Sequence, residues 1–365
     1  MVRQIILVIV LMGAVAYIVW FANLFPTEYR SPAKPPPLLD KVDYNARMLA
    51  LAHFVAPTST TTERTSDVQT LASTTPPILP ISTATTTVSV PGRLWPTPTV
   101  YPNVGALLPF NRILAYYGNF YSKQMGVLGE YPHNELLAKL ASTTALWATA
   151  DPTTPVIPAV QYIAVVAQSA PGMSGFYRAQ MPDSEIDKAL VLAREARGIL
   201  ILDVQVGKST LSAELPELEK YLSLPDVHLA IDPEFSMKFG NAPGTVIGTY
   251  DAADINYAAE YLATVVRDNK LPPKILVVHR FTYDMVTNYK KITPLPEVQV
   301  VMDMDGWGSQ EKKKGTYTHV IAPEPVQFTG LKLFYHADLK PPSLGMLTPE
   351  EILALMPAPI YIQYQ

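Results

Sequence analysis

The chain has 365 residues, a formal net charge of −4 and no cysteine. Without a basic surplus, general nucleic-acid binding is disfavoured, and without cysteine there can be no disulfide, thiol catalysis or cysteine-ligated metal. Hydrophobic residues make up 48 %, charged residues only 16 %, and the 35 prolines are unevenly distributed, so different parts of the chain must have different characters.

The first part of the chain is strongly apolar. Residues 5–25 contain no charged side chain, and Asn23 is their one strongly polar residue. At ~1.5 Å per helical residue, this stretch would cross a hydrocarbon core of ~30 Å. Arg3 precedes it, which favours a cytoplasmic N-terminus. We predict an uncleaved signal anchor at 1–25 with the rest of the chain outside the cytoplasm; a cleaved signal peptide is the alternative.

The next segment, 26–105, has the composition of a stalk. Between residues 56 and 100 there are 19 Ser or Thr residues and 7 prolines. Such a segment buries too little apolar surface to offset the entropy of ordering its backbone. We therefore predict a disordered Ser/Thr/Pro spacer at 26–105, within which 43–54 has the pattern of one short amphipathic helix.

A folded domain is predicted at 106–365, where short runs rich in Val, Ile and Leu alternate with helical patterns. The predicted strands are 112–117, 162–168, 199–206, 227–232, 274–279, 298–303, 331–336 and 360–363. The predicted helices are 135–150, 184–197, 211–224, 252–269, 282–291 and 349–356, with a poorly defined one around 310–317. Eight strand–helix units in this length predict an α/β fold, a (β/α)8 TIM-like barrel. The alternative is a doubly wound open sheet, although no G-x-G-x-x-G follows the first strand.

Polar side chains cluster at the C-terminal ends of the predicted strands. Because side chains alternate along a strand, the apolar sets on one face leave the polar ones facing the barrel interior. This parity predicts inward positions for Gln168, Asp203, Gln205, Asp232, Glu234, Asp303, Asp305, His336 and Gln363. The C-terminal ends of barrel strands are where such enzymes carry their chemistry.

The sharpest of these patterns is Asp232-Pro233-Glu234. Two carboxylates ~7 Å apart on one face of a strand end should have different pKa values, which suits one of them to act as a general acid. Glycoside hydrolysis needs such an acid and a second carboxylate. We assign Glu234 as the acid, Asp232 as the residue that tunes it, and Asp203 or Asp303 as the second carboxylate. Substrate contacts are predicted for Tyr116, Tyr117, Gln168, Gln205, His279, Arg280, Asp305, Trp307, His336 and Gln363.

Two other functions remain open. The domain could bind a glycan or a partner without turning it over. Alternatively, the carboxylates could hold Mg²⁺ or Ca²⁺ in a metal-dependent hydrolase, with His279, Arg280 and His336 on an anionic substrate. There is no H-E-x-x-H zinc motif and no G-x-S-x-G elbow. The preferred interpretation needs neither cofactor nor metal, and its partners are the membrane and a carbohydrate.

Several motifs also resemble a family of exported bacterial proteins, many of them actinobacterial lipoproteins without an assigned reaction. They are 116–132 (YYGNFYSKQMGVLGEYP), 165–177 (VVAQSAPGMSGFY), 202–209 (LDVQVGKS), 230–235 (AIDPEF), 247–256 (IGTYDAADIN), 277–281 (VVHRF), 303–308 (DMDGWG) and 347–353 (LTPEEIL). The resemblance implies an exported TIM barrel that is glycoside hydrolase-like. This chain departs from it in having no lipobox cysteine, Phe235 in place of Trp, and Arg280 in place of Gln.

Overall fold

The computed structural model describes residues 38–52 and 100–365, apart from 325 and 344. The signal anchor predicted at 1–25 and most of the predicted stalk lie outside these residues. Within the described ranges, no helix combines the length and hydrophobicity that crossing a membrane requires.

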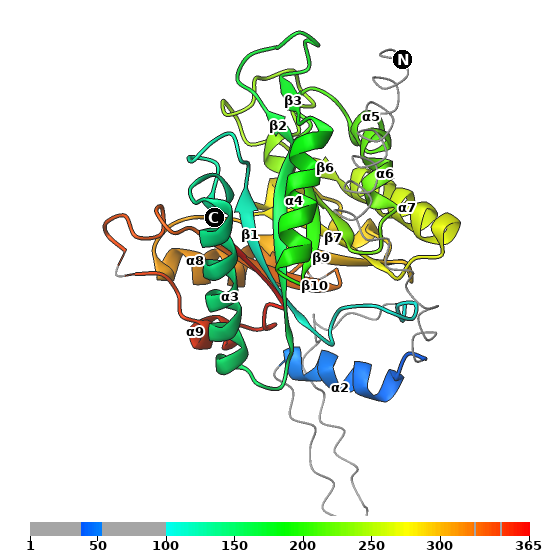
Figure 1. Ribbon diagram of the computed structural model, residues 1–365, viewed down its shortest axis with the longest axis vertical. Coiled ribbons are helices and arrows are strands. Elements are labelled where there is room, and N and C mark those ends of the chain that lie inside the picture. Colours follow the sequence, from blue (N-terminus) through cyan, green and yellow to red (C-terminus); the bar gives the residue numbers. More distant parts are fainter. Residues whose placement is uncertain (1–37, 53–99, 325, 344) are drawn as a thin grey trace, which may run out of the picture. The chain divides into compact units, whose positions relative to one another are not determined.

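In the described part of the chain, eight parallel strands close into a barrel, as predicted (Figure 1). They are β1 (Arg112–Gly118), β2 (Val156–Ala167), β4 (Ile199–Val204), β5 (Val227–Ile231), β7 (Lys274–Arg280), β9 (Val298–Met304), β10 (Phe328–Leu333) and β11 (Tyr361–Tyr364). β1 closes the barrel because it pairs with both β2 and β11. This closure rules out the open doubly wound sheet.

Two small strand pairings lie outside the barrel. β3 (Arg178–Gln180) pairs antiparallel with the end of β2. β6 (Tyr250–Asp251) pairs with β8 (Val286–Thr287). The β6–β8 pairing overturns the helix predicted at 282–291. There, Asn288 adopts a left-handed conformation with φ 56°, and short 3₁₀ turns flank β8, so no regular helix can run through this segment.

The other predicted helices are present with shifted bounds. They are α3 (His133–Ala150), α4 (Asp183–Glu195), α7 (Ala252–Asn269), α8 (Gln310–Thr316) and α9 (Pro349–Leu353). The helix predicted at 211–224 is divided into α5 (Leu211–Glu214) and α6 (Glu219–Leu222), with a 3₁₀ turn between them that starts at Pro216. Proline has no N–H to donate and disfavours continuation of the preceding turn.

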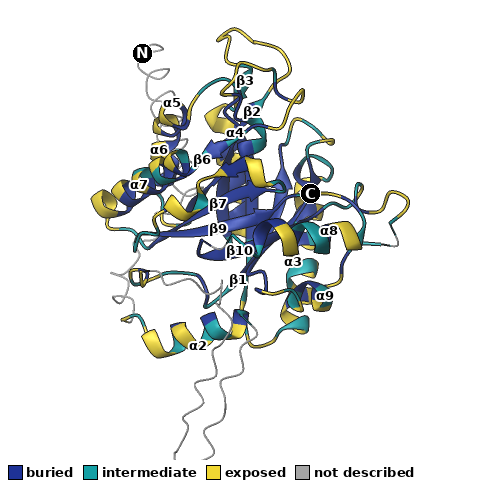
Figure 2. Cartoon of the chain, turned by 180° about the vertical axis from the view of Figure 1, so that it is seen from behind, coloured by how far each residue is buried: buried dark blue, intermediate teal, exposed yellow. Residues whose placement is uncertain are grey.

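Alternation along the strands produces two apolar clusters. Leu200, Leu202 and Val204 of β4 belong to the outer cluster, which also contains the apolar faces of the surrounding helices. Ile199 and Ile201 belong to an inner cluster within the barrel. The strands are therefore buried on both faces, whereas the helices expose their outer sides (Figure 2).

Helix α2 (Lys41–Leu51) covers the N-terminal end of the barrel. Tyr44, Met48 and Leu51 are buried in the inner cluster, and Ala358 N donates to Leu51 O at 2.7 Å. Asp40 caps the helix by accepting from Val42 N at 2.9 Å. The compact unit therefore begins at Leu39, earlier than the boundary predicted at residue 106.

Candidate functional site

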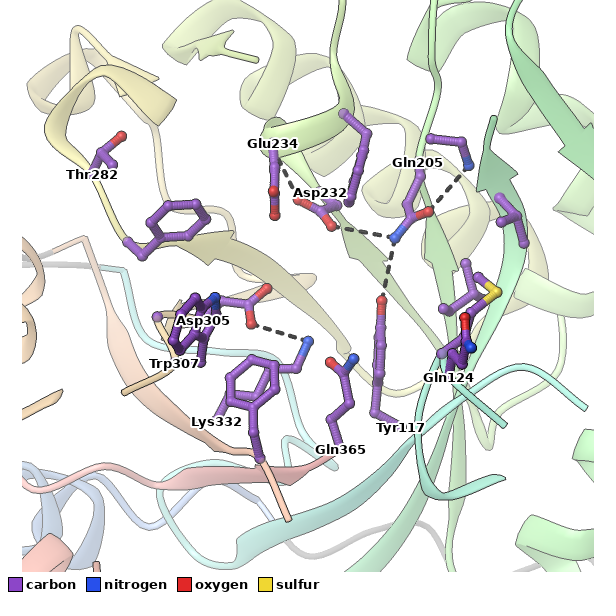
Figure 3. A pocket seen from close by; sticks show the side chains of 18 of the residues that line it. Tyr117, Gln124, Gln205, Asp232, Glu234, Thr282, Asp305, Trp307, Lys332 and Gln365 are labelled. Atoms are coloured by element: carbon purple, nitrogen blue, oxygen red, sulfur yellow. Dashed lines mark hydrogen bonds and ion pairs between the residues drawn. The ribbon is translucent and has the colours of Figure 1, made fainter. Parts of the chain in front are cut away.

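A cavity of about 660 Å³ opens at the C-terminal ends of the barrel strands (Figure 3). Its size falls in the range of small-molecule sites. It is lined by residues that end or directly follow five barrel strands: Tyr117 (β1), Gln205 (β4), Asp232 (β5), Asp305 (β9) and Lys332 (β10). The mouth of the barrel thus gathers side chains that are far apart in the sequence.

The Asp-Pro-Glu motif forms one wall of this cavity. β5 ends at Ile231, and Asp232 caps the following 3₁₀ turn, Pro233–Phe235. One oxygen of Asp232 accepts from Glu234 N at 3.0 Å, and the other accepts from Gln205 Nε2 at 3.4 Å. Pro233 suits the first position of the turn because that position needs no N–H donor. The turn therefore presents both carboxyl groups to the same cavity.

Both carboxyl groups on this wall favour the protonated form. Burial, together with the nearby negative charge of Asp305, raises the pKa of Glu234 to about 7. Burial raises the pKa of Asp232 well above its usual value, and the charge of Glu234 adds to this effect. Glu234 can therefore hold a proton near neutral pH and release it.

The facing wall carries a carboxylate of opposite character (Figure 3). Burial alone would raise the pKa of Asp305, but Lys332 and His279 hold it at about 2. Lys332 Nζ lies 3.0 Å from Asp305 Oδ1, and His279 Nδ1 lies 3.0 Å from Oδ2. Asp305 is thus an ionised carboxylate in the cavity that Glu234 also lines.

Asp203 and Asp303 lie deeper, inside the barrel, where both are fully buried. Asp203 Oδ2 is 2.7 Å from His279 Nε2, and burial raises the pKa of Asp303 to about 7. Gly330 leaves room for Asp303, because a Cβ there would lie 2.6 Å from Asp303 Oδ1. Neither aspartate lines the cavity. The second carboxylate that lines the cavity is therefore Asp305, which lies two residues after Asp303 on the same face.

Of the predicted contact residues, five line the cavity: Tyr117, Gln168, Gln205, Asp305 and Trp307. His279 and Gln363 face the barrel interior and are fully buried. Their inward direction agrees with strand parity, but their depth separates them from the cavity.

Three other predicted contact residues do not line this cavity. Tyr116 lies on the outer face of β1, where its hydroxyl is 2.7 Å from Thr143 Oγ1. Arg280 also faces outward; it donates to the backbone oxygen of Thr282 at 3.1 Å and pairs with Glu324. His336 lies in the loop after β10, 2.8 Å from Glu130, because β10 ends at Leu333 and parity no longer holds beyond it.

Lys332 is a site residue that the sequence analysis missed. It lies within the predicted strand 331–336. Lys332 is four residues before His336, so the two share a face, and an inward His336 implies an inward Lys332. Its ammonium group lies 3.8 Å from the centre of the Tyr117 ring, as well as beside Asp305. Leu331 and Leu333 predict that the other face of the strand, which carries Lys332, points into the barrel. A buried lysine needs a counter-charge, so Lys332 could have been predicted to lie beside one of the inward carboxylates.

Across the described residues, no group of three or more His, Asp or Glu side chains is arranged to hold a metal ion.

The fold and the cavity define an α/β protein with a TIM-like barrel and an acidic site at its C-terminal mouth. Neither a protein-family model nor a curated protein matches the chain. The resemblance to exported bacterial proteins is therefore supported at the level of the barrel fold alone.

Proposed function

We propose that this protein is a glycoside hydrolase-like barrel that acts on glycans of the cell envelope or the environment. The observation that carries the proposal is the contrast between two carboxyl groups of one cavity. Glu234 has a pKa of about 7 and Asp305 a pKa of about 2. Paired carboxyl groups whose surroundings separate their pKa values in this way are typical of acid-catalysed glycoside cleavage.

In this mechanism Glu234 donates its proton to the glycosidic oxygen as the bond to the anomeric carbon breaks. Asp305 remains ionised and stabilises the positive charge that develops on the sugar, either directly or by orienting the attacking water. Lys332 and His279 keep Asp305 ionised and in place. Asp232 accepts from Glu234 N and so fixes the backbone that presents the acid.

Aromatic side chains around the cavity support a sugar substrate. Trp307 lines the cavity and is 54 % exposed, and Lys312 Nζ lies 4.7 Å from the centre of its ring. Tyr117, Phe235, Phe281 and Phe334 line the same cavity. Flat apolar faces beside carboxyl and amide groups match a sugar ring, which has C–H faces and hydroxyl edges.

The location that we propose is outside the cytoplasm, with the chain anchored by the apolar segment 5–25. Its support is the uncharged composition of that segment and the Ser/Thr/Pro-rich stretch that follows. Membrane fractionation of cells that express the full chain tests it: the protein should sediment with membranes and resist extraction by high salt. Release by salt alone would argue against the anchor.

Substitution of the acid tests the enzymatic function. The full-length protein should release soluble sugars from purified peptidoglycan or surface polysaccharide, and Glu234→Gln should lower that rate by about 10²–10⁴-fold. Glu217→Gln serves as a matched control, because Glu217 is exposed and does not line the cavity; its rate should be unchanged. If the wild type binds glycans but releases nothing, the protein is a glycan-binding barrel and the enzymatic proposal is wrong.

A further inference from the structure

A second cavity adjoins the candidate site. It has a volume of about 630 Å³ and shares Gln124, Phe334 and Gln365 with the first cavity. It lies between the loop after β1 and the loop after β10, since its other lining residues come from 123–131 and 336–340. The two cavities therefore meet along a common boundary, and a ligand longer than one sugar unit could occupy both.

The loop after β1 is held firmly in place. Gly126 adopts φ 131°, and a Cβ there would lie 2.4 Å from Tyr117 O. Asn119 Nδ2 donates to Ile163 O at 3.0 Å, and Asn119 Oδ1 accepts from Tyr121 N at 2.9 Å. This wall of the second cavity is therefore pre-formed.

The opposite loop is anchored by a buried aspartate. Asp338 Oδ2 accepts from Phe334 N at 2.9 Å and lies 3.0 Å from Lys313 Nζ. Tyr335 N donates to Gln365 O at 2.8 Å. Because both walls of the cavity are fixed, ligand binding costs little conformational entropy.

The charges of the second cavity differ from those of the first. Its lining side chains include Lys123, Lys340 and His336, whereas Glu130 is its acidic side chain. Glu130 is already engaged, because Oε1 lies 2.8 Å from His336 Nε2. Among the ion pairs of the described residues, none involves Lys123 or Lys340, so both ammonium groups remain available to a ligand.

We infer that the second cavity is a subsite for an acidic sugar unit, so that the substrate of the proposed hydrolase is an anionic glycan. Two ammonium groups recognise a carboxylate or a phosphate, and the ring of Tyr131 lines the cavity beside them. The inference rests on the proposed function for the cleavage step, but the binding preference that it predicts can be measured without turnover.

The test is binding of three oligosaccharides of equal length to the full-length protein. One is a hyaluronan hexasaccharide, one is its carboxyl-reduced form, and one is that reduced form carrying a single phosphate group. We expect one or both acidic ligands to bind about five- to tenfold more tightly than the reduced form, and the preference should weaken in high salt. Which acidic ligand binds better distinguishes carboxylate from phosphate recognition.

The double variant Lys123→Gln/Lys340→Gln should lose this preference and keep the affinity for the reduced form. Lys290→Gln/Lys291→Gln is the matched control, because these lysines follow β8 and do not line either cavity; it should keep the preference. Equal affinity for all three ligands, no binding of any, or a preference that persists in the double variant would overturn the subsite. An unchanged rate in Glu234→Gln would instead contradict the proposed hydrolysis and leave the binding preference intact.

Discussion

The two ends of this barrel are built from the same strands but have opposite chemistry. At the N-terminal end, β4 contributes Ile199 and Ile201 to an apolar cluster that α2 covers. Beyond the other end of the same strand, Gln205 lines the open cavity. The sequence of polar and apolar residues along each strand therefore divides the barrel into an apolar base and a polar mouth.

The contrast has a physical cause. At the base, burial of apolar side chains is favourable and needs no partner. At the mouth, burial penalises every charge, so each ionised group must have a counter-charge, as Asp305 has in Lys332, or remain protonated, as Glu234 does. Burial of the ionisable groups at the mouth therefore costs free energy, which the apolar burial at the base must offset.

The largest stability effect is expected from removal of the counter-charge at the mouth. Lys332→Met keeps the size of the side chain but leaves Asp305 with His279 alone. Loss of one partner of a buried ion pair should lower the free energy of unfolding by about 3–5 kcal/mol, measured by urea denaturation. Lys312→Met is the control, since Lys312 lines the same cavity but is exposed, and it should change stability by less than about 1 kcal/mol. Equal effects of the two variants would show that the Asp305–Lys332 pair does not stabilise the mouth.

A somewhat smaller effect is expected at the base. Met48 of α2 is buried in the inner cluster, so Met48→Ala should lower the free energy of unfolding by about 2–3 kcal/mol. Ligand affinity at the mouth should not change, because the substitution lies at the opposite end of the barrel. Val42→Ala is the control, as Val42 is 80 % exposed and should alter stability by no more than about 0.5 kcal/mol. A wild-type stability in Met48→Ala would mean that α2 is not part of the folded unit.

The smallest effect is a pH dependence of stability that arises at the mouth. Glu234 has a folded pKa of about 7 against an ordinary value of 4.5, so the folded state binds its proton more tightly than the unfolded state does. Its contribution is thus fully present below about pH 4.5 and is lost as pH rises through 7. The full shift corresponds to about 3 kcal/mol, and because Glu234 is only partly buried we expect the wild type to lose about 2 kcal/mol more stability than Glu234→Gln between these values.

The measurement is urea denaturation of both proteins at pH 4.5 and pH 8. The titration of Asp305 does not interfere with this comparison. Its pKa is lowered to about 2, so its contribution to stability is fully present above about pH 4 and is lost only as the pH falls towards 2. Parallel stability curves for the wild type and Glu234→Gln would contradict the raised pKa of Glu234.

The sequence alone determined the barrel and most of its interior. Short runs rich in Val, Ile and Leu predicted all eight strands, and the parity along them placed Asp203, Asp232 and Asp303 inward, as found. These features depend on the two-residue period of a strand and on local contacts, both of which can be deduced from neighbouring residues. The capping box that Thr348 and Glu351 form at the start of α9 is an equally local feature.

Depth along the barrel axis was decided by the tertiary structure alone. Asp303 and Asp305 share a face, yet Asp303 is buried beside Gly330 whereas Asp305 lines the cavity. Access to the cavity depends on the side chains that neighbouring strands place at the same height along the barrel axis. The docking of α2 under the barrel likewise depends on an apolar surface assembled from residues far along the chain. Arg280 faces outward by the same parity that places His279 inward, but its ion pair with Glu324 depends on the packed chain. A period of two tells which face a residue occupies, but only the packed strands decide how deeply that face is buried.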